Sequence, residues 1–353
     1  MQSWEQDTAP IRPGEELDTA RLSGYLSGKL AGARDGIRVE QFPGGHSNLT
    51  YLVEAGGVEY VLRRAPLGPV APKAHDMARE YRILHAVSPH FRPAPKPFLL
   101  CEDPAVIGAV FFIMERRRGV VLRTEIPEPW ASDARLPELV SKAFLDCLVE
   151  MHSVDIGRHG LDSLGKPPGF VERQVRGWTE RWYRAKTEDL PEMDRVIAYL
   201  TGHLPPDGPP TIVHNDFKLD NLMLDPANPA RVEAVLDWEM TTVGDPMVDL
   251  GLTLCYWDPP DKEVREGPVP CLTQGPGWLT KQELANEYAR RTGRDMSALA
   301  YHEILGVFKL AVIVQQIYHR WWKGQTRDER FSRFHLRVKS LVEAAAARLE
   351  AAV

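Results

Sequence analysis

Cysteine is scarce in this chain of 353 residues, and the few cysteines form no recognisable motif. They stand far apart and make no CxxC pair, at positions Cys101, Cys147, Cys255 and Cys271. Such spacing argues against a disulfide framework and against a zinc site. We therefore expect reduced thiols and a cytoplasmic location.

Long apolar runs and basic runs are missing as well. No stretch approaches the roughly 18 apolar residues that a membrane-spanning helix needs, and residues 1–18 are acidic and polar, without an apolar signal segment. The 43 Lys and Arg residues are scattered among 49 Asp and Glu residues, which leaves a formal charge of −6. This pattern offers no basic surface, so we expect no nucleic acid and no membrane as a partner.

The chain otherwise has a globular composition, with 43% hydrophobic and 26% charged residues. Leucines at near-helical spacing predict a helix over 14–30. Short β-type segments over 37–65 then predict a three-strand meander with paired glycines in its turns. With a helix over 74–87 and further strands up to residue 115, this part predicts a small α+β unit.

Beyond this unit the chain becomes mainly helical. A 3.6-residue apolar period predicts helices over 138–154, 170–185 and 193–204. Helices are also predicted to close the chain over 299–322, which carries a long apolar run, and over 329–350. Short apolar segments at 211–216, 221–225 and 232–238 are typical of strands that carry loops. The predicted fold class is α+β, with a small β-rich N-terminal lobe and a larger, mainly helical C-terminal lobe.

The strongest chemical signal is the segment HNDFKLDN at 214–221, in which His, Asp and Asn have the spacing of a kinase catalytic loop. Phosphoryl transfer needs an Asp that orients the attacking hydroxyl and accepts its proton, and an amide oxygen that helps to hold Mg²⁺. Asp216 and Asn221 are predicted for these two roles, and His214 is predicted to brace the loop. Taken alone, an HxD sequence is often only a structural turn.

A second signal lies at the end of the apolar segment VEAVLDW. Asp237 is predicted to bind Mg²⁺ there, with Glu239 as a further oxygen donor. The alternative is that a strand-end Asp caps the next element. Asp245 and Asp249 are predicted to brace the catalytic loop through hydrogen bonds.

The N-terminal lobe contains neither a complete GxGxxG pattern nor a Walker GK[ST] sequence. A glycine-rich segment between two strands can still cover triphosphate oxygens, and its candidate residues are Gly44, Gly45, Ser47 and Asn48. A simple hairpin turn is the alternative. Arg63 takes the position at which kinases carry the phosphate-binding Lys, and Glu80 is placed to pair with it unless it only lies on a solvated helix face.

Two further groups are candidates for ligand contacts. Met114, Glu115 and Arg116 end the last strand of the N-terminal lobe, where a purine ring could bond to backbone groups, although core packing explains this apolar strand equally well. The acceptor-pocket candidates are Arg176, Trp178 and Trp182. Packing of an aromatic stripe against the lobe is the alternative for these tryptophans. If the arginines of this helix face the acceptor, an anionic acceptor is favoured over a polycationic one.

The segments 214–251, 170–185 and YVLRRAP at 60–66 together resemble the aminoglycoside phosphotransferase and choline kinase-like superfamily, over roughly residues 20–330. They look most like the kinase-like branch found fused to acyl-CoA dehydrogenases. This resemblance implies a two-lobed protein-kinase-like fold, with a nucleotide-binding lobe at 1–116 and a catalytic and acceptor-binding lobe at 117–353. It also implies ATP or GTP with Mg²⁺ as cofactors and a small-molecule hydroxyl acceptor, such as a hydroxyacyl-CoA or related hydroxy acid. A functional link to an acyl-CoA dehydrogenase follows from the same branch.

Three alternative functions stay open at this point. An aminoglycoside or a choline-like amino alcohol is the other acceptor class. A nucleotide-binding pseudokinase is kept open by Arg63. A metal-assisted hydrolase would use His214, Asp216 and Asp237, but the chain lacks HExxH and any cluster of histidines.

Overall fold

The computed structural model describes residues 7–43, 48–66, 76–128, 130–260, 264, 271–326 and 328–352. The chain divides into two compact units. Unit 1 comprises Met1–Val121 and Leu222–Thr241, and unit 2 comprises Leu122–Asn221 and Thr242–Val353. The predicted nucleotide-binding and catalytic lobes stay a prediction, and the hairpin at Leu222–Thr241 belongs to unit 1. No helix within these described ranges is long and apolar enough to span a bilayer.

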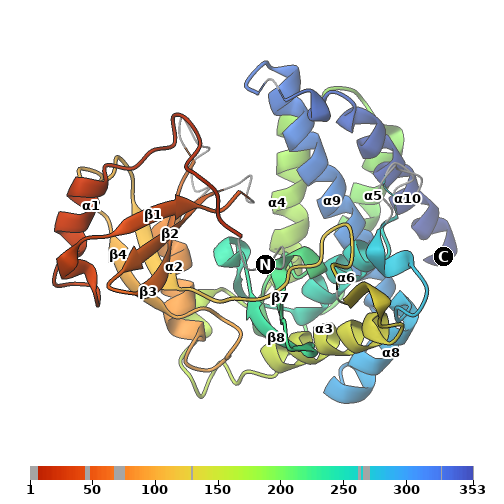
Figure 1. Ribbon diagram of the computed structural model, residues 1–353. Helices are drawn as coiled ribbons and strands as arrows, with labels where there is room; N and C mark the ends of the chain where they lie inside the picture. Colours follow the sequence, from red (N-terminus) through yellow and green to blue (C-terminus); the bar gives the residue numbers. More distant parts are fainter. Residues whose placement is uncertain are drawn as a thin grey trace. The chain divides into compact units, whose positions relative to one another are not determined.

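Unit 1 is built on a five-stranded antiparallel sheet in the order β1-β2-β3-β5-β4 (Figure 1). The strands are β1 (Arg38–Gln41), β2 (Leu49–Ala55), β3 (Val58–Arg64), β4 (Pro97–Cys101) and β5 (Phe111–Glu115). The predicted three-strand meander is therefore confirmed. Gly56 and Gly57 join β2 to β3 with φ of 55° and 79°, a backbone conformation that only glycine adopts without steric cost.

Helices and a second hairpin complete unit 1. They are α1 (Thr19–Leu26), η1 (Ala33–Asp35), α2 (Met77–Val87), β7 (Leu222–Asp225), β8 (Asn228–Val235) and η5 (Trp238–Met240). The predicted helix over 14–30 is too long, because Asp18 caps the start of α1 by accepting from Arg21 N and the positive φ of Gly28 follows its end at Leu26. Leu22 and Leu26 bury its apolar face in the core of the unit.

Unit 2 is mainly helical (Figure 1). Its helices are α3 (Leu136–His152), α4 (Phe170–Ala185), α5 (Pro191–Gly202), α6 (Pro246–Trp257), α8 (Lys281–Thr292), α9 (Leu299–Trp322) and α10 (Phe334–Ala352). Two short strands, β6 (Thr211–Val213) and β9 (Thr242–Gly244), pair with each other. Short 3₁₀ turns are η2 (Trp130–Ser132), η3 (Asp162–Leu164), η4 (Leu219–Asn221), η6 (Leu272–Gln274) and η7 (Glu329–Phe331). All five predicted helices are present, and α6 and α8 are additional.

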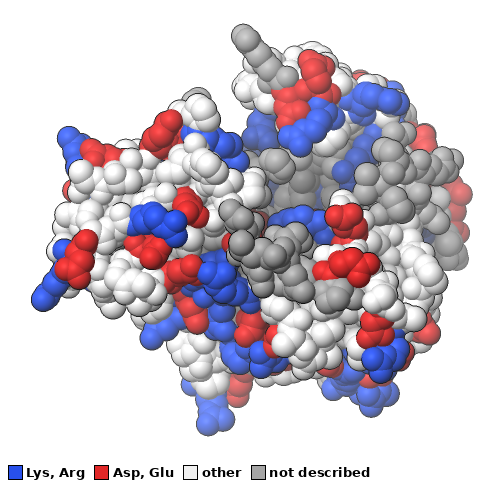
Figure 2. All heavy atoms as spheres, viewed as in Figure 1, with Lys and Arg blue, Asp and Glu red and all other residues white. Residues whose placement is uncertain are grey.

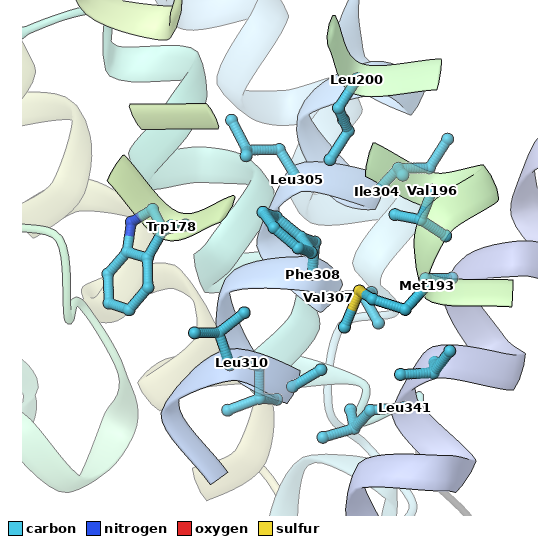
Figure 3. Packing of buried hydrophobic residues seen from close by; sticks show 14 of the residues in the cluster. Trp178, Met193, Val196, Leu200, Ile304, Leu305, Val307, Phe308, Leu310 and Leu341 are labelled. Atoms are coloured by element: carbon cyan, nitrogen blue, oxygen red, sulfur yellow. The ribbon is translucent and has the colours of Figure 1, made fainter. Parts of the chain in front are cut away.

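The core of unit 2 forms around α9, which packs against α4, α5, α6 and α10. Figure 3 shows Ile304, Phe308 and Leu310 of α9 among residues of its neighbours. Full burial of a large apolar side chain contributes roughly 1.5–3 kcal/mol. Three polar side chains, His302, Lys309 and Gln315, are buried on the same helix.

Charged side chains of both signs are interspersed on the face shown in Figure 2. Exposed ion pairs of unit 1 include Arg38–Glu54 at 2.7 Å and Arg118–Glu59 at 2.6 Å. Such exposed pairs contribute about 0–1 kcal/mol each. The ion pairs that bear on function are the buried ones.

Candidate active site

In unit 1, one buried arginine lies among three predicted site carboxylates. Arg63, on β3, has its Nε 3.4 Å from Glu80 Oε1 of α2 and donates through NH2 to Asp237 Oδ1 at 3.0 Å. Glu239 adds a third negative charge close enough to affect Arg63. The Asp237 side chain is 30% exposed, whereas that of Glu80 is 1% exposed. Of the two carboxylates that pair with Arg63, Asp237 is therefore the one that ions from solvent can reach.

The negative charges of this group outnumber the positive one, because a single guanidinium, that of Arg63, lies near three carboxyl groups. Burial opposes the charge of Arg63, but Glu80 and Asp237 raise its pKa above the ordinary value. The pKa of Glu80 is raised to about 7, chiefly by burial, with Asp237 and Glu239 raising it and Arg63 lowering it. Arg63 thus stays a cation near neutral pH, whereas Glu80 gives up its charge in that range.

Arginine and asparagine side chains tie the Asp237 turn to the rest of unit 1. Arg79 of α2 donates to the main-chain oxygen of Glu239 and, at 2.5 Å, to that of Thr241. Asn48, at the start of β2, donates to Glu239 Oε2 at 2.9 Å. Sequence reasoning missed Arg79, which carries no motif. The predicted contacts Gly44, Gly45 and Ser47 lie outside the described residues.

The purine-contact candidates end β5 and are engaged with protein groups. The main-chain N–H of Glu115 donates to Lys96 O at 2.8 Å, and Met114 is buried opposite Val61. Arg116 pairs with Asp7 at 2.6 Å. The Glu115 N–H is therefore already used by the sheet, and a ligand would have to bind other groups of this segment.

In unit 2, the predicted catalytic loop follows β6 and is held from α6. Asp249, fully buried, accepts the main-chain N–H groups of His214 and Asn215, each at 2.7 Å. His152 Nε2 lies 3.3 Å from the same carboxylate. Burial opposes ionisation of Asp249, but hydrogen bonds from His152 and the loop lower its pKa below the usual value. The loop thus rests on an ionised carboxylate.

The carboxylate of Asp216 is surrounded by donors from three positions. Asn221 Nδ2 donates to its Oδ2 at 2.8 Å, and Tyr256 OH donates to its Oδ1 at 2.8 Å. Lys218 Nζ lies 3.2 Å from Oδ2. Burial, and then Asp216, raise the pKa of Tyr256 well above its ordinary value, so the phenol keeps its proton and acts as a donor. Sequence reasoning missed Tyr256, which lies 40 residues away in an apolar segment.

The backbone is unusual at two of these places. Among the described residues, Asn215 and Asp237 are the two non-glycine residues with positive φ, each at 66°. This left-handed conformation costs free energy for a residue with a side chain, and such strain gathers at functional sites. One lies directly before Asp216 and the other is the predicted metal ligand.

The remaining predicted residues of unit 2 are not all brought together. Asp245 caps α6 by accepting from Met247 N at 2.8 Å, and also accepts from Gly208 N at 2.7 Å. Trp178 and Trp182 are buried in the core of the unit, whereas Arg176 on the same helix is exposed. The two tryptophans therefore pack inside the unit.

The donor atoms suit a hard cation such as Mg²⁺. In unit 1, Asp237 and Glu239 offer carboxylate oxygens, which Mg²⁺ prefers. In unit 2, the nitrogen of the Asn221 amide is committed to Asp216, which leaves its Oδ1 as the atom for a metal. Arg63 Nε is buried without a hydrogen-bond partner among the described residues, and an anionic oxygen could supply one.

Comparison with known proteins shows several similarities. Residues 38–301 match the model of a family described as the phosphotransferase enzyme family. Mouse (Mus musculus) acyl-CoA dehydrogenase family member 11 is 36% identical over 334 residues, covering 92% of this chain and 42% of the mouse protein. Mouse acyl-CoA dehydrogenase family member 10 is 34% identical over 322 residues, covering 90% of this chain and 30% of that protein. The chain thus spans less than half the length of these curated relatives.

Solved structures share the fold. A Ralstonia eutropha protein, provisionally described as an aminoglycoside phosphotransferase, is 30% identical with a TM-score of 0.81, covering 95% of this chain and 99% of that one. A thermostable aminoglycoside phosphotransferase APH(4)-Ia in complex with ADP and hygromycin B is 17% identical, with a TM-score of 0.58 and coverage of 91% and 97%. At that identity the likeness shows the fold alone. The predicted α+β, protein-kinase-like fold is confirmed.

Proposed function

The chain belongs to the phosphotransferase enzyme family, and we propose that it transfers the γ-phosphoryl group of a nucleoside triphosphate to a hydroxyl group of a small acceptor. Membership confirms the predicted resemblance and the predicted enzyme class, a phosphotransferase with an alcohol group as acceptor. The observation that carries the proposal is the carboxylate of Asp216, which is 19% exposed and held by Asn221, Tyr256 and Lys218. A carboxylate oriented in this way suits a base for a hydroxyl group.

In the proposed reaction, Asp216 accepts a hydrogen bond from the acceptor hydroxyl and takes its proton as the oxygen attacks the γ-phosphorus. The bond between the γ-phosphorus and the bridging oxygen of the β-phosphate breaks, and the nucleoside diphosphate leaves. Tyr256 and Asn221 keep the carboxylate in one orientation, because each donates to a different oxygen. Phosphoryl transfer depends mainly on positioning and on charge stabilisation, so fixed donors around the base suit it.

Unit 1 supplies the proposed nucleotide contacts. Arg63 binds phosphate oxygens with its buried guanidinium, and Glu80 orients Arg63. Asp237, Glu239 and Asn221 are the proposed residues for Mg²⁺, and a bound Mg²⁺ would neutralise phosphate charge. Asn48, with the undescribed Gly44, Gly45 and Ser47, is proposed to cover the triphosphate. Met114, Glu115 and Arg116 stay the proposed purine contacts.

For the acceptor, we propose an anionic molecule of the hydroxyacyl-CoA or hydroxy acid class. Basic side chains lie near the proposed base. Lys218 pairs with Asp216, and the charge of Arg337 lowers the pKa of Tyr256. The names of the curated relatives, acyl-CoA dehydrogenases, support an acyl-CoA substrate and a functional link to such an enzyme. The four cysteines are free thiols, in keeping with a reaction in the cytoplasm.

A second candidate is a nucleotide-binding pseudokinase. Its support is the ion pair between Arg63 and Asp237, because the guanidinium occupies the carboxylate that a metal would need. An active enzyme must exchange this pair for contacts with phosphate and Mg²⁺. The two candidates therefore differ in whether a bound nucleotide is turned over.

The test is a thermal-shift titration with ATP and GTP, with and without Mg²⁺, followed by a phosphorylation assay. The acceptors to compare are 3-hydroxybutyryl-CoA, choline and kanamycin. A Mg²⁺-dependent rise in melting temperature with turnover of the CoA ester supports the proposal, since a ligand that binds only the folded state stabilises it. Asp216→Ala should bind Mg²⁺-ATP normally and lose at least about 100-fold in turnover. Binding without turnover on any acceptor would favour the pseudokinase.

A further inference from the structure

Lys309 is a lysine buried in the middle of α9, 2% exposed, and it lies in sequence between the apolar residues Phe308 and Leu310. Its Nζ donates to the main-chain oxygen of Asn215 at 3.0 Å and to Asn215 Oδ1 at 3.1 Å. The ring of Trp178 lies 5.5 Å from the same nitrogen. No carboxylate of the described residues forms an ion pair with it.

This arrangement is costly for the fold. An ammonium group loses its hydration on burial, and neutral oxygens replace that hydration less well than a carboxylate would. Burial lowers the pKa of Lys309 to about 8, although Asp249 and Asp216 act in the opposite direction. A methionine would fill the position without this cost. Core packing therefore does not account for a lysine here, whereas its bonds to Asn215 can.

Asn215 is the residue whose backbone determines the direction of Asp216. Its N–H is held by Asp249 at 2.7 Å, and its φ is 66°. Its carbonyl group belongs to the same rigid peptide plane as the N–H of Asp216. A donor on that carbonyl therefore fixes the plane from which the Asp216 side chain departs. Lys309 supplies this donor from a helix 94 residues away in sequence.

We propose that Lys309 is a positioning residue for Asp216: it fixes the peptide plane between Asn215 and Asp216 and so aims the carboxylate. The proposal rests on the proposed function, because it takes Asp216 to be the base. The charged groups that act on Lys309 are Asp249 of α6, Asp216 of the loop and Arg181 of α4. Loss of the ammonium proton on the alkaline side weakens the hold on the carbonyl, so turnover falls there.

The experiment compares Lys309→Met with Gln315→Met in the full chain. Gln315 is also buried on α9, and it donates to Ala185 O at 2.8 Å, so its loss removes a buried hydrogen bond without touching the loop. The probe reaction is slow phosphate release from Mg²⁺-ATP with water in place of the acceptor. Amide hydrogen exchange of His214 and Asn215 is measured in parallel, because it needs no turnover.

We expect Lys309→Met to lower the maximal rate about tenfold or more, with less than about twofold change in the Mg²⁺-ATP concentration for half-maximal rate. Exchange at His214 and Asn215 should rise about tenfold. Gln315→Met should match the wild type in both readouts. Equal losses in the two variants, or unchanged exchange in Lys309→Met, would overturn the positioning role. No phosphate release from the wild type would instead count against the proposed function, and exchange would still test the loop.

Lys309→Gln keeps the test decisive if Lys309→Met does not fold. Its neutral amide retains a donor for the Asn215 carbonyl without a charge that titrates. We expect a rate at pH 7 within about fivefold of the wild type, and no decline between pH 7 and pH 9, where the wild type declines. The same decline in Lys309→Gln and in the wild type would refute the role of Lys309.

Discussion

Replacing Tyr256 by Phe removes one atom, the hydroxyl that donates to Asp216 Oδ1 at 2.8 Å. The ring of Tyr256 stays to pack at its place in α6, so the change isolates the hydrogen bond. Asn221 and Lys218 still hold Oδ2, but the donor on Oδ1 is lost, so the carboxylate can turn more freely. We expect Tyr256→Phe to lower kcat and to leave KM for Mg²⁺-ATP unchanged.

The magnitude follows from the strength of the bond. A hydrogen bond to a charged group contributes about 1.5–3 kcal/mol, and a change of about 1.4 kcal/mol in the barrier alters a rate tenfold. If the bond acts mainly on the orientation of the base, kcat should fall roughly 10- to 100-fold. Stability should change by less than about 1 kcal/mol, because the partly exposed Asp216 can bond to water instead.

The assay is steady-state phosphorylation of the best acceptor found, with chemical denaturation as the measure of stability. Tyr301→Phe is the matched control, since this buried tyrosine of the same unit donates to Leu200 O at 2.8 Å, away from the loop. A control variant with normal kcat and a Tyr256→Phe variant with a reduced one would support the reasoning. A rise in KM at unchanged kcat would refute it and would place Tyr256 in substrate binding.

Three further predictions concern the buried charges. Arg63→Lys should weaken the ion pair with Asp237 and keep nucleotide affinity within about tenfold. The Mg²⁺ concentration needed for half-maximal nucleotide binding should therefore fall in a titration, and a higher concentration would contradict this. Asp237→Ala should abolish the Mg²⁺-dependent part of the thermal shift by ATP, and an unchanged shift would remove Asp237 from the metal site. The pKa of Lys309 is lowered to about 8 in the folded chain, so between pH 8 and pH 10.5 the unfolded chain binds more protons at Lys309 than the folded chain does. The free energy of unfolding must therefore rise with pH in this range. Relative to Lys309→Met, the free energy of unfolding of the wild type should increase by roughly 3 kcal/mol from pH 7 to pH 10.5, and a flat difference would show that Lys309 is not buried as a cation.

Much of the fold and of the candidate site could be predicted, because the signals are local. The apolar run of α9 and the short β-type runs of β2 and β3 reflect the burial of these elements, which a short window of sequence records. The spacing from His214 to Asn221 likewise lies within a single loop. For α8 a local signal was present as well, since Thr280 and Glu283 form a capping box.

Other features have no local signal. The helix α6 is buried on nearly all sides, so its sequence has no polar face and no helical period to detect. Tyr256 and Lys309 reach the catalytic loop from 40 and 94 residues away, and nothing near them in the sequence distinguishes them from core residues. The same holds for Arg79, whose bonds to the turn after Asp237 depend on the packing of α2 in unit 1.

Each unit has a residue with a left-handed backbone conformation that is bound by the side chain of a buried cation. Asn215 is held by Lys309, and Asp237 is held by Arg63, each residue at a φ of 66°. A buried cation and a left-handed residue each cost stability, and such costly features gather at functional sites. In unit 2, the proposed role of Lys309 requires its bond to the Asn215 carbonyl to last through the reaction. In unit 1, the ion pair between Arg63 and Asp237 must be broken for the proposed reaction, because phosphate would bind Arg63 and Mg²⁺ would bind Asp237. Substitution of Lys309 should therefore act on the chemical step, and substitution of Arg63 on nucleotide and metal binding.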